Sequence, residues 1–260
     1  MTDPDNLARH VAIVTGGSRG VGRALAALML QQGWRVLTLQ RRPAPLSDTE
    51  AQAGADARQL EQWACDLSEP APVAQRLAQW LQALPRAGLA SLSLINNAAA
   101  LSHLAALQQL TADEVARDLR VGLEAPLVLS SAFLRASADV SAPRRLLHIS
   151  SGLGRRAMAG SVVYCASKAG LDHMSRAIAL EQATLPNGAK SVSLAPGVID
   201  TDMQLQLRSA DPAAFAAQAQ FAALKAEGRL DSPQGCARKL LAYLQSADFG
   251  RQPVADIRDT

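Results

Sequence analysis

Aromatic residues are scarce in this chain, because phenylalanine, tryptophan and tyrosine together make up 3% of its 260 residues. Proteins that bind single-stranded nucleic acid stack the bases on aromatic side chains, so this composition disfavours a nucleic-acid partner. Hydrophobic residues nevertheless reach 48%, which is too high for intrinsic disorder. We therefore expect a globular protein whose core consists mainly of aliphatic side chains.

Cysteine and clustered charge are scarce as well. The three cysteines, Cys65, Cys165 and Cys236, show no CxxC spacing. The odd number and the spacing predict neither a disulfide framework nor a metal site. We therefore expect reduced thiols, as in a cytosol. The net charge is +3, and the basic residues occur as scattered pairs rather than runs. We expect a solvated surface for these pairs, which are Arg41-Arg42, Arg144-Arg145 and Arg155-Arg156.

Long apolar runs are missing from the sequence. A membrane-spanning helix needs about 20 consecutive apolar residues, and the longest runs here are shorter. The first ten residues are polar and include Asp3 and Asp5, unlike a secretory signal. We expect a cytoplasmic protein that has no membrane partner.

What the chain does have is an alternation of short apolar runs with longer amphipathic stretches. The runs predict a short strand near Val254 and six others at residues 10–15, 35–40, 59–64, 92–96, 145–150 and 191–195. The stretches predict helices at residues 20–32, 72–84, 111–135, 162–181, 213–226 and 233–245. This order is typical of right-handed βαβ units. We expect an α/β protein with one domain over residues 1–260, a Rossmann-type doubly wound fold and a seven-stranded, mostly parallel sheet.

A glycine-rich turn lies between the first predicted strand and the first predicted helix. Gly16, Gly20 and Gly22 have the spacing GxxxGxG. Glycines at such a turn allow the backbone to approach a pyrophosphate closely, and the helix N-terminus offers free N–H groups to it. The position after the first strand favours a dinucleotide site over an ordinary glycine-rich turn.

The end of the second predicted strand indicates which dinucleotide. An NAD site places a carboxylate there for the ribose 2′-hydroxyl, but this chain has Gln40 followed by Arg41 and Arg42. Arg19 in the glycine turn could converge with Arg41 on a 2′-phosphate, because guanidinium groups bind phosphate through paired hydrogen bonds. The sequence therefore favours NADP(H) over NAD(H).

A second constellation lies at the predicted helix 162–181. Tyr164 and Lys168 are four residues apart and so share one helix face. Ser151 follows the fifth predicted strand, at the carboxyl edge of the sheet, where open α/β folds bind ligands. The alternative is a capped amphipathic helix with a surface lysine.

Together these motifs resemble the short-chain dehydrogenase/reductase family over nearly the whole chain. The matching segments are residues 15–22, Asn96-Asn97-Ala98, Ser151, Tyr164 with Lys168, and Pro196-Gly197 with Thr201. The resemblance implies hydride transfer between a nicotinamide cofactor and a carbonyl or alcohol. It also implies a cofactor site at Gly16, Ser18, Arg19, Gly20, Val21, Arg41, Arg42, Asp66, Leu67, Asn96, Ala98, Tyr164, Lys168, Pro196, Gly197, Ile199, Thr201 and Met203.

The resemblance assigns a role to each catalytic candidate. Tyr164 would give its phenolic proton to the carbonyl oxygen, and Ser151 would orient that oxygen. A free phenol has a pKa near 10, so we expect the charge of Lys168 and of the nicotinamide ring to lower the pKa of Tyr164. Gly122 stands where many relatives carry an asparagine that organises a proton relay, and Ala99 stands where they often have glycine.

The carboxyl third, at residues 195–204, 224–230, 237–241 and 254–259, resembles the sepiapterin reductase subfamily. That resemblance implies an NADPH-dependent carbonyl reductase in which Asp256 holds the guanidine-like edge of a pterin. Two alternatives stay open, a general α-diketone reductase of the benzil type and a non-catalytic NADP(H)-sensing regulator. The expected substrate site consists of Ser151, Gly152, Leu153, Met158, Tyr164, Gly197, Met203 and Asp256. The family also implies a homodimer that packs through residues 111–135 and 162–181.

Overall fold

The computed structural model describes residues 9–45, 47, 57–101 and 104–260, so residues 1–8 of the polar start lie outside the described part. One sheet of seven strands has the order β3-β2-β1-β4-β5-β6-β7, and every pairing in it is parallel. The strand order changes direction between β1 and β4, which is where doubly wound sheets open a ligand crevice. The strands are β1 (His10–Thr15), β2 (Arg35–Gln40), β3 (Leu60–Ala64), β4 (Ser91–Asn96), β5 (Arg144–Ile149), β6 (Lys190–Ala195) and β7 (Val254–Asp256).

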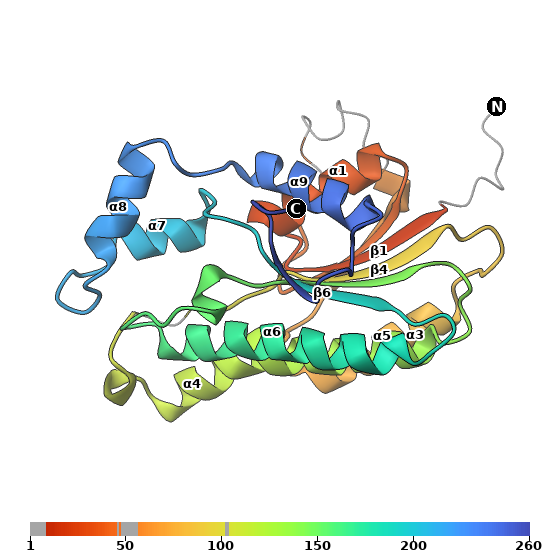
Figure 1. Cartoon of the computed structure of the whole chain (residues 1–260), viewed down its shortest axis with the longest axis horizontal. Coiled ribbons are helices and arrows are strands. Elements are labelled where there is room, and N and C mark those ends of the chain that lie inside the picture. The colour runs from red at the N-terminus through yellow and green to blue at the C-terminus, as the bar shows by residue number, and fades with distance from the viewer. Residues whose placement is uncertain (1–8, 46, 48–56, 102–103) are drawn as a thin grey trace.

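Helices cover both faces of this sheet (Figure 1). Helices α1 (Gly20–Gln31) and α9 (Pro233–Gln245) pack against each other on one face. The other face carries α3 (Pro70–Gln82), α5 (Ala125–Ala136) and α6 (Val162–Ala183). Helix α4 (Ala112–Leu119) leads into α5, while α7 (Asp202–Arg208) and α8 (Gln218–Ala226) project beyond the sheet. The Rossmann-type fold expected from the sequence is confirmed.

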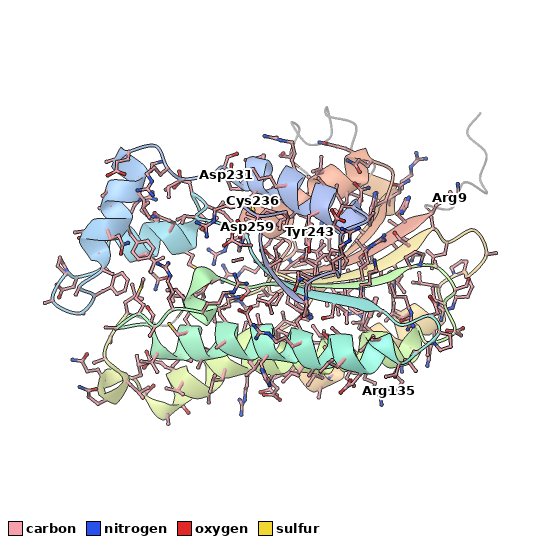
Figure 2. All side chains as sticks on the ribbon, in the orientation of Figure 1. Arg9, Arg135, Asp231, Cys236, Tyr243 and Asp259 are labelled. Atoms are coloured by element: carbon pink, nitrogen blue, oxygen red, sulfur yellow. The ribbon has the colours of Figure 1, made fainter. Side chains whose placement is uncertain are left out.

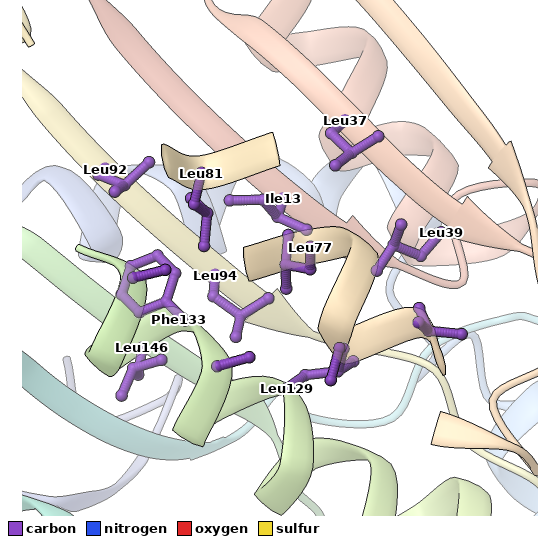
Figure 3. Packing of buried hydrophobic residues seen from close by; sticks show 14 of the residues in the cluster. Ile13, Leu37, Leu39, Leu77, Leu81, Leu92, Leu94, Leu129, Phe133 and Leu146 are labelled. Atoms are coloured by element: carbon purple, nitrogen blue, oxygen red, sulfur yellow. The ribbon is translucent and has the colours of Figure 1, made fainter. Parts of the chain in front are cut away.

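Aliphatic side chains fill the space between the sheet and the helices, as the scarcity of aromatics predicts. Figure 3 shows Leu77 of α3 and Leu129 and Phe133 of α5 meeting Ile13 and Leu94 of the sheet, and all five are fully buried. A second cluster joins the opposite face to α1 and α9. Truncating one such buried leucine to alanine typically costs about 2–5 kcal/mol.

The helix expected over residues 111–135 is interrupted. It begins as predicted, because the Thr111 backbone N–H donates to Glu114 Oε2 at 2.8 Å and the Glu114 N–H donates to Thr111 Oγ1 at 3.3 Å. Residues Arg120–Glu124 then form one π-helical turn between α4 and α5. A Cβ at Gly122 would lie 2.9 Å from Ser167 Oγ of α6, so this turn packs against α6 only without a side chain. Single π-turns within helices occur frequently at functional sites.

Other differences from the expected elements are small. The helix expected at 213–226 begins only at Gln218, and a separate helix, α7, precedes it. Proline at the start of α3 places that helix at residues 70–82 rather than 72–84. Within the described residues, no helix combines the length and the apolarity that a membrane span requires.

Candidate active site

The glycine turn links β1 to α1 and lies against Asn97 and Ala98, which follow β4. Gly16 and Gly20 have φ values of +73° and +56°, which favour glycine. A Cβ at Gly22 would overlap the carbonyl oxygen of Gly16. Thr15 Oγ1 accepts hydrogen bonds of 2.9 Å from the backbone N–H groups of Asn97 and Ala98. The turn is therefore held open beside β4, and the cradle that it forms has the shape expected for a pyrophosphate.

The expected cofactor residues lie along one edge of the sheet, the one formed by the carboxyl ends of the parallel strands. Asn96 is the last residue of β4, and the others follow β1, β2, β3, β4 and β6 or begin the next helix. A Cβ at Gly20 would lie 3.6 Å from Thr201 Cγ2, so the segment after β6 reaches the glycine turn. The residues present thus fit a dinucleotide. This set comprises Gly16, Ser18, Arg19, Gly20, Val21, Arg41, Arg42, Asp66, Leu67, Asn96, Ala98, Pro196, Gly197, Ile199, Thr201 and Met203.

The two arginines expected to share a phosphate have different surroundings. Arg19 Nη1 lies 2.7 Å from Asp202 Oδ2 at the start of α7. Arg41 is exposed after β2, and its charge contributes to the lowered pKa of Asp66, for which the hydrogen bond from the Ser68 N–H is the larger cause. Both side chains of the Arg19–Asp202 pair are about 70% exposed, so the pair is weak enough to be exchanged.

Ser151, Tyr164 and Lys168 lie together. Ser151 caps the short 3-10 turn Gly152–Gly154, and its Oγ accepts from the Leu153 N–H at 3.1 Å. Its side chain also hydrogen-bonds Tyr164. Lys168 Nζ lies 5.4 Å from the centre of the Tyr164 ring and donates to the Ile149 carbonyl oxygen at 2.6 Å. The three candidates from two elements therefore form one cluster.

The pKa values of Tyr164 and Lys168 in this cluster differ from those of the free side chains. Burial raises the pKa of Tyr164 to about 12, and the hydrogen bond from Ser151 offsets only part of that shift. The lowering of this pKa expected from Lys168 together with the nicotinamide ring stays a prediction for the protein with its cofactor bound. Burial also lowers the pKa of Lys168 to about 8, against the opposing effect of Asp172. Tyr164 is therefore protonated at neutral pH, as a general acid must be.

Asp172 is a residue that the sequence did not single out. It lies one turn after Lys168 and is 2% exposed. Its Oδ1 accepts from Ser150 Oγ and Ser193 Oγ, each at 2.7 Å, and its Oδ2 lies 3.0 Å from Arg155 Nε. The i, i+4 spacing from Lys168 was the available signal, since it places both on one helix face.

The solvated surface expected for the arginine pairs is wrong for Arg144, and the exposed Arg155 also has specific partners. Arg155 binds Asp172 and also donates from Nη2 to the Ala255 carbonyl oxygen at 2.8 Å. Arg144 is 5% exposed and donates to the Asn187 carbonyl oxygen. Burial lowers the pKa of both Arg144 and Arg145. These arginines bind carbonyl and carboxylate groups that the fold brings to them from distant segments.

The expected substrate residues surround the cluster only in part. Gly152 and Leu153 belong to the turn capped by Ser151, and Met158, Gly197 and Met203 are partly or fully exposed. Asp256 is already paired, because the Arg258 guanidinium donates to its two oxygens at 2.8 and 2.6 Å. A cavity that the sequence did not predict lies beside Tyr164, lined mainly by Leu101, Leu104, Leu110, Val162 and Val163.

Of the three thiols, Cys236 lies far from this cluster, whereas Cys165 follows Tyr164 directly on α6 and contributes to the rise in the Tyr164 pKa. All three cysteines are free. Cys236 and Tyr243 lie on α9, which covers the opposite face of the sheet (Figure 2). Cys236 is buried, and burial raises its pKa to about 12, so it is protonated at neutral pH. Among the described residues, no group of histidine, cysteine and carboxylate side chains could hold a metal ion.

Known proteins are similar to this chain over its full length. A Bacillus cereus benzil reductase ((S)-benzoin forming) is 28% identical, with 94% of this chain and 98% of that protein covered. Mouse sepiapterin reductase is 34% identical, with coverage of 99% and 100%. A solved structure from Beutenbergia cavernae, which holds NADP at low occupancy, is 27% identical with a TM-score of 0.79, and 98% of this chain and 97% of that one are covered. The family model for short chain dehydrogenases matches residues 10–212. The chain therefore belongs to the short-chain dehydrogenase family of nicotinamide-dependent oxidoreductases.

Proposed function

We propose that this protein is an NADPH-dependent reductase of a ketone or a vicinal dicarbonyl compound. The observation that carries the proposal is the cluster geometry: the half-buried Tyr164 is hydrogen-bonded by Ser151, and Lys168 Nζ lies 5.4 Å from the centre of its ring. A tyrosine that keeps its phenolic proton at neutral pH suits reduction, because the carbonyl oxygen must gain a proton.

Three side chains would carry the reaction. Ser151 Oγ donates a hydrogen bond to the substrate oxygen and orients it. Tyr164 gives its phenolic proton to that oxygen as negative charge develops there. The Lys168 ammonium, held by the Ile149 carbonyl oxygen, stabilises the phenolate that remains. Each contribution is electrostatic and is strengthened by burial.

NADPH supplies the hydride when it is bound. The glycine turn with Gly16 and Gly20 would hold its pyrophosphate, and Arg19 and Arg41, with Arg42 beside them, would bind the 2′-phosphate through charge-assisted hydrogen bonds. Segments after β3, β4 and β6 would hold the adenine, the ribose and the carboxamide. Similarity to a structure with NADP bound supports this assignment.

Two substrates are candidates. Similarity to sepiapterin reductase favours a pterin with a side-chain ketone, anchored on Asp256. The pairing of Asp256 with Arg258 favours the second candidate, a diketone of the benzil type, because such a substrate needs no carboxylate anchor.

The test is a substrate panel of sepiapterin, benzil and diacetyl, with NADPH and with NADH. Tyr164→Phe should abolish cofactor oxidation and leave NADPH binding measurable by fluorescence. Unchanged turnover in that variant would refute the mechanism. Asp256→Ala should impair only sepiapterin reduction if the pterin anchor is used. Failure of the wild type to reduce sepiapterin, together with turnover of benzil, would leave the diketone as the substrate.

We further propose that the protein is a cytoplasmic homodimer. Each subunit would be a single domain over residues 1–260, and the two subunits would pack through α5 and α6. Leu127 of α5 is 45% exposed and Leu180 of α6 is 74% exposed, and burial of such side chains favours association. Leu180→Glu should therefore give a monomer by light scattering. Leu205→Glu, which alters a 49% exposed leucine on α7, serves as the matched control and should remain dimeric.

A further inference from the structure

One side-chain amide fastens the segment that follows β2. Gln62 on β3 accepts the Ala44 N–H on Oε1 at 2.9 Å and donates from Nε2 to the Ala44 carbonyl oxygen at 2.8 Å. The same Oε1 accepts from Gln40 Nε2 at 2.9 Å. Gln62 therefore pairs with both peptide groups of Ala44, much as a neighbouring strand would, and ties them to the last residue of β2.

Further bonds fix both ends of this segment. The carbonyl oxygen of Gln40 accepts from the Cys65 N–H at 2.9 Å, and the carbonyl oxygen of Pro45 accepts from Arg23 Nη2 at 2.8 Å. Between Gln40 and Ala44 lie only Arg41, Arg42 and Pro43, all exposed. Proline has a fixed φ, so few backbone conformations can join the two anchored ends.

Gln62 also holds the side chain of Gln40 out of solvent. Gln40 occupies the strand end where an NAD-binding protein presents its carboxylate. Here its side chain is 4% exposed and turned to Gln62, so the next exposed side chain at this edge is Arg41. The amide of Gln62 thus withdraws one side chain from the ribose and fixes the backbone of the two that follow.

We propose that Gln62 is a positioning residue for cofactor choice: it holds the bend at Arg41 and Arg42 in the conformation that receives the 2′-phosphate. This inference rests on the proposed use of NADPH. A bend that is ordered before binding loses less conformational entropy when its guanidinium groups engage a phosphate. Gln62 touches neither the cofactor nor the substrate, so its effect should fall on NADPH and spare NADH, which lacks that phosphate.

The test variant is Gln62→Met, which keeps the shape of the side chain and removes all three hydrogen bonds. We expect KM for NADPH to rise about tenfold, the loss of roughly one charge-assisted hydrogen bond, while KM for NADH and kcat change less than about twofold. Thr38→Val is the matched control. Thr38 is the direct partner of Gln62 in the β2–β3 register, and its Oγ1 is buried with no hydrogen-bond partner in the described residues. Both KM values should stay unchanged in it.

A double-mutant cycle separates positioning from a general structural effect. In an Arg41→Ala/Arg42→Ala background, Gln62→Met should have no further effect on KM for NADPH, because its action passes through those arginines. If Gln62→Met folds poorly, Ala44→Pro removes one of the bonds from the loop side and leaves β3 intact, with a smaller rise expected. Melting temperatures check the fold of each variant.

The outcomes distinguish this inference from the proposed function. If Arg41→Ala/Arg42→Ala raises KM equally for NADPH and NADH, the 2′-phosphate site itself is wrong. If that variant discriminates between the cofactors but Gln62→Met raises both KM values or neither, the inference on Gln62 is overturned. An effect of Gln62→Met that persists undiminished without the two arginines would overturn it as well.

Discussion

Lys168 is expected to set the alkaline limit of catalysis. Burial lowers the pKa of its ammonium to about 8 and raises the pKa of Tyr164 to about 12. As the pH rises, Lys168 therefore loses its proton long before Tyr164 does. Tyr164 keeps its proton, but Lys168 no longer carries the positive charge that stabilises the phenolate. The value of kcat/KM for NADPH reports ionisations of the free protein. It should be constant near neutrality and lie about tenfold lower at pH 9 than at its plateau, one unit above the pKa of Lys168.

Variants identify the group responsible for this limit. The Asp172 carboxylate raises the pKa of Lys168, so Asp172→Asn should move the alkaline limb to lower pH. Ser193→Ala is the matched control, because it removes one hydrogen bond to the same carboxylate and leaves the charge in place. Lys168→Arg carries a guanidinium that does not titrate in this range, so its profile should lack the limb and have a lower plateau.

The assay is the initial rate of NADPH oxidation at limiting NADPH, measured from pH 6 to pH 10 with a saturating diketone. An alkaline limb near pH 10 or above in the wild type would contradict the burial argument for Lys168. A limb that stays in place in Asp172→Asn would show that the carboxylate does not act on Lys168. A limb that persists in Lys168→Arg would assign it to another group.

Three further predictions concern single substitutions. Lys168→Met should abolish turnover yet raise the free energy of unfolding at pH 7 by about 2 kcal/mol, as measured by urea denaturation. Burying the charged lysine costs the wild type roughly 3 kcal/mol, and the variant gives back part of that gain because the Ile149 carbonyl loses its partner. Burial lowers the pKa of His148 to about 3. Below pH 6.5 the unfolded chain therefore binds a proton at His148 that the folded protein does not bind, and the free energy of unfolding decreases as the pH is lowered. His148→Asn should remove that loss, about 2 kcal/mol at pH 5, in urea titrations at pH 7 and pH 5. Arg258→Ala should lower KM for sepiapterin by up to about fivefold without altering KM for benzil, because the exposed Arg258 competes for Asp256 with at most about 1 kcal/mol.

The sequence predicted those parts of the protein that depend on local spacing. The glycines at 16, 20 and 22 predicted the turn between β1 and α1, because only a few backbone conformations suit that spacing. The i, i+4 relation of Tyr164 and Lys168 predicted one shared helix face. Ser151 could be added because the carboxyl ends of parallel strands meet at one edge of the sheet.

Charge states were beyond the reach of the sequence. The pKa of Tyr164 depends on how much water the fold removes from its hydroxyl, and the sequence carries no measure of that burial. Arg155 and Asp172 are 17 residues apart, and only the packing of α6 against the turn after β5 brings them to 3.0 Å. Such pairs depend on tertiary structure, so a basic dipeptide read alone looks like solvated surface.

Gly122 departs from the family pattern, and the residues that it contacts show what the departure affects. The sequence shows only that an asparagine common in relatives is missing. In the structure the π-turn that contains Gly122 lies against Ser167, whose Oγ donates to the Val163 carbonyl oxygen at 2.9 Å. An asparagine side chain would have to displace that hydroxyl, which precedes Lys168 by one residue. Glycine at 122 and serine at 167 therefore form one packing arrangement, and an asparagine at 122 would require Ser167 to shift and its Oγ to give up the bond to Val163.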